Sequence, residues 1–386
     1  MTFVEMIDIK IEAITTSNQE SGCYALYGEG KLLIVDSNFS TIKSEISIPN
    51  MQIITNNINN IQMEGNEPQI TIYFYHPYVC VTEQFGVSAA LVNIETNVVR
   101  ELRRKDYHSN VSSYSIGFVE RNGRILLICQ TEWNRLDIFD AETGKNLTER
   151  EIYWLDTGKR NSDGSILTDT KNHLDYFHSL LHISPDGKHF LSNGWNWHPY
   201  GQVLLFETEE FLRKFELSNV QTKYELTDNW DLPCTFINND LFIVAKDDVS
   251  KARDLPLHIK QEYVYKQLWF FRVSEGAQED SYGRRWLKPY KEVACDVFTT
   301  NEHGHVYGQL YYDSIKKYLV AITPDKGAFS LDMNGKILNF LPNVFSCDIY
   351  DYDTYCGRQF GWKYDINHHV FYTWQDNVGI LERQFN

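Results

Sequence analysis

One short pattern occurs seven times along the chain, and this repetition constrains the fold more than any other feature. Each copy is an apolar, strand-like segment that ends in a polar or charged residue and is followed by a turn. The copies are KLLIVD ending at Asp36, SAALVN at Asn93, RLDIFD at Asp140, VLLFE at Glu207, LWFFR at Arg272, AFSLD at Asp332 and VGILE at Glu382. A second strand-like segment precedes each copy, and a short polar turn such as SPDGK (184–188) precedes that segment.

The pattern predicts sheets that are covered on both faces and stacked around an axis. The segments are continuously apolar or alternate, and the turns are rich in residues that reverse a chain. Radial repetition of four-stranded sheets explains both properties. We therefore predict an all-β fold: a seven-bladed β-propeller of four-stranded antiparallel blades, forming a single domain over residues 1–386.

The expected blades can be placed on the sequence, and the N-terminal segment is expected to complete the last one. We expect blades at roughly 11–50, 68–105, 112–152, 176–219, 232–294, 304–342 and 357–386 plus 1–10. After VGILERQFN no outer strand follows, whereas MTFVEMIDIKI is strand-like and has no blade of its own. We expect this N-terminal strand to close the ring.

Two of the predicted blades carry motifs of a known family. The series FHSLLHISPDGKHFLSNGW (177–195) resembles a WD40-type blade, and RLDIFDAETGKNLTE (135–149) looks like the end of another. The remaining blades match by spacing and pattern. The chain thus resembles the WD40-like β-propeller superfamily, and bacterial WD40-like repeat proteins in particular. The resemblance implies a protein-binding scaffold.

Composition and charge exclude several classes of partner. The formal net charge of −16 repels phosphate backbones, so we expect no binding of nucleic acid. No apolar run approaches the length of a membrane-spanning helix, and Glu5 and Asp8 interrupt any secretory signal. Seven cysteines without a C-x-x-C pair predict buried, reduced thiols. We expect a cytoplasmic protein that does not bind membranes, and the sequence leaves its oligomeric state open.

The long connections are expected on one face of the propeller. With strands a to d numbered from the centre of each blade outwards, a-to-b and c-to-d turns emerge on one face, and d-to-a and b-to-c connections emerge on the other. The long segments are 151–176, 247–265 and roughly 342–357, and all three are of the second type. Long loops in compact domains are commonly functional, so we expect binding on this face.

The ends of the b strands supply the candidate ligand-binding residues. They are aromatic and acidic, and they would form a rim around the central opening. The candidates are Trp195, Trp197, His198 and Tyr200 in blade four, Glu83 in blade two, Glu132 and Trp133 in blade three, and Trp374 and Asp376 in blade seven. The blade-four group could equally cap its blade against the neighbouring blades.

The sequence supports a metal site or catalysis less than it supports ligand binding. His178 and His182 share a strand but lie about 13 Å apart at strand spacing, so we interpret them as hydrogen-bonding residues of the fold. No motif of a serine hydrolase, nucleotide-binding loop or zinc protease occurs. We expect no cofactor.

Two functions follow from these observations. The first is a non-catalytic binding module for a protein, peptide or small ligand. The alternative is a lactonase or hydrolase of the propeller type, with Glu83, Glu132 and Asp376 as metal ligands or bases at the central channel.

Overall fold

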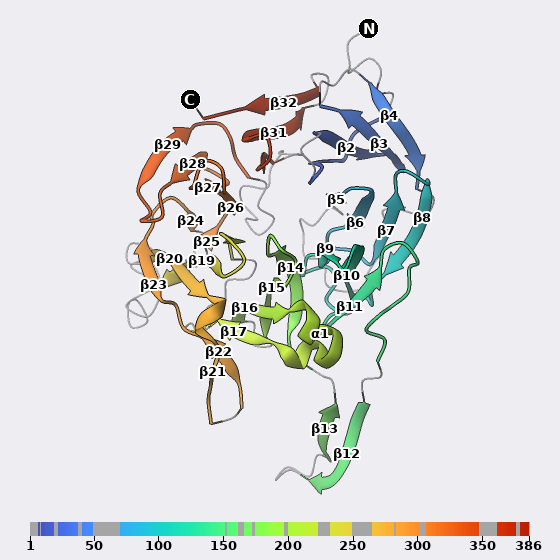
Figure 1. The fold of residues 1–386 in the computed structure, drawn as a ribbon, viewed down its shortest axis with the longest axis vertical. Helices are drawn as coiled ribbons and strands as arrows, with labels where there is room; N and C mark the ends of the chain where they lie inside the picture. The colour runs from blue at the N-terminus through green and yellow to red at the C-terminus, as the bar shows by residue number, and fades with distance from the viewer. Residues whose placement is uncertain are drawn as a thin grey trace.

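The computed structural model shows a ring of β-sheets arranged around a central axis (Figure 1). It describes residues 7, 9–18, 22–37, 41–48, 70–150, 153–160, 166–171, 174–196, 200–222, 232–248, 265–281, 283–300, 306–346, 361–375 and 379–385. The predicted seven-bladed, all-β propeller is confirmed, and most of the blades are four-stranded and antiparallel.

The first three blades follow one another from the N-terminal part of the chain. Blade one contains β1 (Ala13–Thr16), β2 (Cys23–Gly28), β3 (Lys31–Asp36) and β4 (Ile42–Ser47). Blade two contains β5 (Ile70–Tyr75), β6 (Tyr78–Glu83), β7 (Ser88–Asn93) and β8 (Val98–Arg103). Blade three contains β9 (Ile116–Arg121), β10 (Arg124–Glu132) and β11 (Arg135–Asp140).

Blades four to seven complete the ring. Blade four contains β14 (Phe177–Ile183), β15 (His189–Asn196), β16 (Tyr200–Glu207) and β17 (Val220–Thr222). Blade five contains β18 (Cys234–Phe236), β19 (Leu241–Asp248), β20 (Tyr265–Arg272) and β23 (Lys291–Ala294). Blade six contains β26 (Gln309–Asp313), β27 (Tyr318–Ile322), β28 (Ala328–Leu331) and β29 (Ile337–Leu341). The described part of blade seven contains β30 (Lys363–Asp365), β31 (Val370–Gln375) and β32 (Gly379–Arg383).

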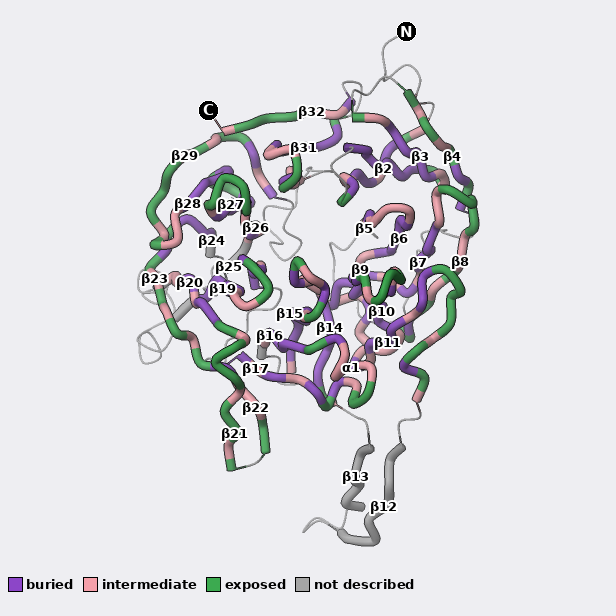
Figure 2. Tube along the Cα trace, in the orientation of Figure 1, coloured by how far each residue is buried: buried purple, intermediate pink, exposed green. Residues whose placement is uncertain are grey.

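Apolar side chains fill the space between neighbouring blades. In β2, Ala25 and Tyr27 pack toward blade two, whereas Tyr24 and Leu26 pack toward blade seven. Because successive side chains of a strand point to opposite faces, every residue of β2 is buried between two neighbours. The outermost strands lose this cover, and Figure 2 shows β8 and β29 largely exposed.

Blade seven packs directly against blade one. Tyr372 and Trp374 of β31 share a buried cluster with Ile14 and Leu26 of blade one, and Ile7 and Ile9 pack against the same cluster. The Tyr24 hydroxyl also donates a hydrogen bond to Glu382 of β32. Most of the N-terminal strand expected to close the ring lies outside the described residues, so its pairing stays a prediction.

In blade three, a buried charge network replaces a regular outer strand. The backbone N–H of Ile138 donates to Thr148 Oγ1 at 2.8 Å, and the N–H of Leu136 donates to Glu216 Oε1 at 2.9 Å. Arg150 pairs with Asp137 at 2.9 Å and with Glu216 at 2.5 Å, and all three side chains are at most 3% exposed. These side chains satisfy backbone groups that a fourth strand would otherwise pair with.

Within the described residues, three further strand pairs are inserted into the propeller. In the expected loop 151–176, β12 (Tyr153–Arg160) and β13 (Ile166–Lys171) form a hairpin that projects away from the ring (Figure 1). Between β20 and β23 the chain forms β21 (Gln278–Glu279) and β22 (Arg285–Leu287), and β22 pairs with β17 in parallel, which extends blade four. The connection between β20 and β23 is a c-to-d connection, so long connections are not confined to the d-to-a and b-to-c types. A short hairpin, β24 (Thr299–Thr300) and β25 (Val306–Tyr307), precedes blade six.

Helical structure is sparse in the part of the chain that the structure describes. A seven-residue helix, α1 (Thr208–Lys214), and a 3₁₀ turn at Phe215–Ser218 follow β16, and a second 3₁₀ turn at Val273–Glu275 follows β20. Within the described ranges, no helix is long and apolar enough to cross a membrane.

The blade-three network generates a prediction about stability. Replacing Arg150 with Met removes the cation that pairs with both Asp137 and Glu216. Asp137 keeps its ion pair with Arg135, whereas the buried Glu216 loses its ion pair with Arg150. We expect Arg150→Met to lower the free energy of unfolding by about 3–5 kcal/mol, measured by urea denaturation.

The matched control is Arg124→Met. The side chain of Arg124 is 72% exposed and lies 3.8 Å from Asp140, so its loss is expected to cost less than about 1 kcal/mol. Equal destabilisation by the two substitutions would contradict a special role for the buried network.

Candidate functional site

The structure places the sequence-predicted site residues in two kinds of environment. Glu83, Glu132, Trp195 and Trp374 lie at or near the ends of b strands, and Trp133 follows β10 directly. Trp195 is a residue of β15 and not of a loop, because β15 continues to Asn196. Tyr200 begins β16. Trp197, His198 and Asp376 lie outside the described residues.

Trp133 and Trp195 belong to one aromatic cluster that also contains Tyr107, His108 and Phe177. The rings of Phe177 and Trp195 are stacked, with centroids 3.7 Å apart. Trp133 packs on Phe177 at 4.3 Å, and Tyr107 lies 5.7 Å from Trp133. Phe177 and Trp195 are buried, whereas Tyr107 is 53% exposed. The cluster therefore presents one tyrosine to solvent on a rigid aromatic base.

Arg104 positions the segment that carries Tyr107 and His108. Its buried guanidinium donates to the carbonyl oxygens of Gly86 at 2.7 Å and of Ser109 and Ser112 at 2.8 Å. It also donates to Gln130 Oε1 at 2.5 Å, and it stacks over the Tyr114 ring. One side chain thus joins the b-to-c turn of blade two, the connection to blade three and β10.

A cleft of about 590 Å³ adjoins the aromatic cluster between blades two and three. Its lining includes Glu83 and Glu132 from the b-strand ends, and the segment from Arg103 to Asp106 that leads into Tyr107. Lys105 Nζ pairs with Glu132 at 2.9 Å, and the exposed Arg103 adds a second cation. The cleft therefore offers both signs of charge to a bound molecule.

Glu83 lines this cleft and also shapes the turn beside it. Its Oε2 accepts the backbone N–H groups of Val87 and Ser88 at 3.2 and 3.1 Å. Its side chain lies so close to Gly86 that a Cβ there would meet Oε2 at 2.3 Å. Glu83 is 4% exposed, and its Oε1 has no hydrogen-bond partner among the described residues.

Trp374 does not join this site. Trp374 is 5% exposed and packs in the interface between blades seven and one. The structure brings no three His, Cys, Asp or Glu side chains into a metal-binding group within the residues it describes. Glu83 and Glu132, the described members of the proposed metal set, instead contact backbone amides and Lys105.

His178 and His182 lie within the blade and not on the rim. His178 Nδ1 is 2.8 Å from Ser192 Oγ, and a register shift in β14 between Phe177 and Leu180 interrupts the simple alternation of side chains. Burial, reinforced by the charge of Arg150, lowers the pKa of His178 to about 3. Burial lowers the pKa of His182 to about 4. Both histidines are neutral near pH 7.

Sequence reasoning missed Tyr107, His108, Phe177 and Arg104. The segment RRKDYHSN (103–110) has no strand pattern and is short, so no length signal marked it. Its one available signal was the aromatic Tyr107-His108 pair directly after a basic run. In the sequence, Phe177 has the pattern of an ordinary core residue, and the structure shows that it is buried.

Comparison with known proteins supports the fold. No family model matches the chain, and no curated protein matches it in sequence. Among solved structures, it is similar to hydrazine synthase of Kuenenia stuttgartiensis, with a TM-score of 0.55 and 12% identity over 98% of this chain and 96% of that one. It is also similar to the Cps50 (Swd1) β-propeller domain of Myceliophteria thermophila, with a TM-score of 0.52 and 10% identity over 97% and 96% of the two chains. The chain has a β-propeller fold.

The burial of Trp195 predicts a large effect of its removal on stability. Trp195 is 3% exposed and stacked on Phe177, so Trp195→Ala leaves a cavity in the aromatic base. We expect it to lower the free energy of unfolding by about 3–5 kcal/mol. Tyr107→Ala removes an exposed ring and is expected to change stability by only about 0.5 kcal/mol. Urea denaturation measures both losses. Equal losses for the two variants would contradict the assignment of Trp195 to the buried base and of Tyr107 to the exposed surface.

The buried histidine predicts acid sensitivity. Because the pKa of His178 is about 3 in the folded chain and near 6.5 when unfolded, only the unfolded chain takes up a proton between these values. The folded chain therefore has its full stability with respect to His178 above about pH 6.5. That stability is lost progressively as the pH falls toward 3. Between about pH 7 and pH 5 we expect a loss of about 2 kcal/mol from this residue. His178→Gln should flatten the pH dependence of the unfolding free energy by that amount, and an unchanged slope would contradict it.

Proposed function

We propose that this WD40-like propeller is a non-catalytic binding module whose partner docks over blades two to four. The docking surface comprises the aromatic cluster (Tyr107, His108, Trp133, Phe177 and Trp195) and the adjoining cleft between blades two and three. The observation that carries the proposal is the exposed Tyr107 ring seated on a buried aromatic base beside a charged cleft. The propeller fold is consistent with a protein-interaction scaffold.

The geometry favours a protein or peptide partner over a compact small molecule. Tyrosine and tryptophan anchors surrounded by polar groups are typical of binding hot spots in protein interfaces. Two carboxylates and two cations line one groove: Glu83 and Glu132, and Arg103 and Lys105. An extended segment that presents an aromatic or apolar residue to Tyr107 and side chains of both charges to the cleft matches this arrangement.

A rigid base increases the affinity that one exposed ring can contribute. The Arg104 hydrogen bonds hold the 105–112 connection before any partner arrives, so binding loses little conformational entropy there. The Phe177–Trp195 stack similarly fixes the surface beneath Tyr107. The same burial makes Trp195 a poor choice for testing the site, because its removal would disturb the fold.

The test compares Tyr107→Ala with the wild type in a quantitative affinity pull-down from the source cells. We expect proteins enriched on the wild type to be depleted at least tenfold on the variant, because about 1.4 kcal/mol is a modest loss for an aromatic anchor. The matched control is Tyr290→Ala, which removes a 38% exposed tyrosine from blade five. Depletion by both variants, or identical partner sets on all three proteins, would contradict the docking surface.

A further inference from the structure

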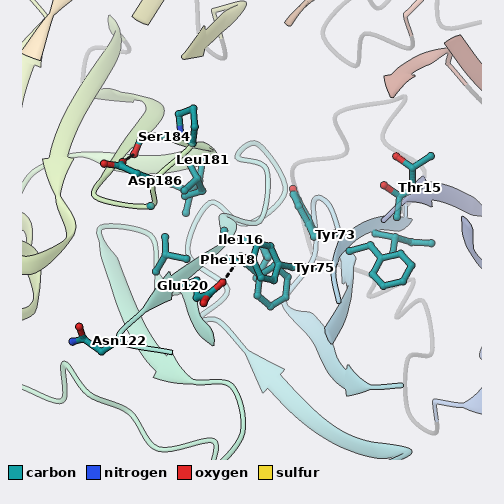
Figure 3. Close-up of a pocket in the computed structure, with 18 residues that line it drawn as sticks. Thr15, Tyr73, Tyr75, Ile116, Phe118, Glu120, Asn122, Leu181, Ser184 and Asp186 are labelled. Carbon is teal, nitrogen blue, oxygen red and sulfur yellow. Dashed lines mark hydrogen bonds between the residues drawn. The ribbon is translucent and has the colours of Figure 1, made fainter. Parts of the chain in front are cut away.

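A second cavity opens at the opposite end of the inner strands. Its volume is about 600 Å³, and it is lined by residues along β1, β5, β9 and β14, including Ile116 to Glu120 of β9, and by the turn at Ser184–Gly187 (Figure 3). The C-terminal ends of these strands lead into the a-to-b turns, whereas the aromatic cluster lies at the b-to-c turns. The volume falls in the range of sites for small molecules or single side chains.

The wall of the cavity combines polar groups with an apolar, partly aromatic surface. The rings of Tyr75 and Phe118 are stacked with centroids 5.8 Å apart, and Figure 3 shows them side by side with Tyr73 nearby. Leu181 contributes an aliphatic surface from blade four. Three neighbouring blades thus supply apolar surface to one cavity, and Thr15, Thr16 and Asn122 add polar groups to its lining. This combination suits a ligand that has both an apolar part and a polar or charged group.

The charges in the cavity are of one sign. Glu120 and Asp186 line it, and no basic residue occurs among the described residues that line it. Tyr75 Oη donates a long hydrogen bond of 3.4 Å to Glu120 Oε2, which places this carboxylate beside the stacked rings (Figure 3). An aromatic face and a carboxylate attract the same cation.

Asp186 keeps its charge in this setting. Partial burial alone would raise its pKa, but hydrogen bonds from Lys188 N and Ser184 Oγ and the ammonium of Lys188 hold the pKa below its usual value. Lys188 lies 3.2 Å from Asp186 and compensates part of that charge, and it is not among the lining residues. Glu120 is therefore the main anionic group facing the cavity.

We propose that this cavity binds an organic cation, with its ammonium or guanidinium group at Glu120 and its apolar body against Tyr75, Phe118 and Leu181. The net charge of −16 raises the local concentration of such cations around the whole molecule. The two ends of the inner strands differ accordingly: the cleft of the docking surface carries both signs of charge, and this cavity carries only acids. The cation site does not depend on the docking surface described above.

A charge series on one ring tests the proposal. Isothermal titration calorimetry with 2-phenylethylammonium, 2-phenylethanol and phenylacetate varies the charge while the aromatic body stays the same. We expect the cation to bind with one site per chain and at least tenfold more tightly than the alcohol, and phenylacetate to show no binding. Equal affinity for the cation and the alcohol, or no binding of the cation, would overturn the proposal.

Substitutions then locate the binding site. Glu120→Gln keeps the shape of the side chain and removes its charge, and should weaken binding of 2-phenylethylammonium at least tenfold. Glu275→Gln removes an exposed carboxylate of blade five that does not line the cavity, and should leave affinity unchanged. Thermal melts establish that both variants are folded. Unchanged affinity in Glu120→Gln would overturn the placement, because a cation bound in the cleft at Glu83 and Glu132 would behave in that way.

A peptide arm distinguishes the source of the cation. The blocked peptide acetyl-Gly-Lys-Gly-amide carries the same ammonium on a polypeptide backbone. Binding of this peptide that is lost in Glu120→Gln indicates that the cavity receives a side chain of another protein. Binding of 2-phenylethylammonium alone indicates a free amine, and both results support the cation site. Tyr107→Ala should affect neither titration, so the failure of one proposal does not decide the other.

Discussion

The structure depends on the packing of each blade between two neighbours. Among the described residues, seven apolar clusters lie between consecutive blades. One of them joins blade seven to blade one, so every blade packs against two neighbours. Each middle strand supplies alternate residues to two of these clusters, so no single blade has a core of its own. A blade removed from the ring would expose both faces, and stability therefore belongs to the whole ring.

Local departures from the repeat are compensated by polar networks of defined composition. Blade three lacks a regular outer strand, and Thr148, Arg150 and Glu216 satisfy the backbone of β11 in its place. Arg104 performs a comparable role at the junction of blades two and three. Both networks are buried, so their loss would leave polar groups without water or partner. The second network also fixes the surface that we propose for partner binding.

The two proposed sites use the two ends of the inner strands. At one end, Tyr107 stands on a buried aromatic base beside a cleft of mixed charge. At the other, Glu120 lies beside stacked aromatic rings in a cavity without basic residues among its described lining. Propellers place strand ends of several blades close together around one axis, so residues far apart in sequence form a shared surface. Because the cleft is of mixed charge and the cavity is acidic, two different ligands could bind one molecule.

The sequence by itself determined the blade count and the all-β class, because the period of strands and turns is a local property that seven copies repeat. It also identified Trp133 and Trp195, since aromatic residues at b-strand ends stand out. Only the tertiary structure decided that Trp195 is buried, that Trp374 packs elsewhere, and that Tyr107, Phe177 and Arg104 complete the cluster. Exposure and proximity depend on how blades pack against each other, and no single blade's sequence contains that information.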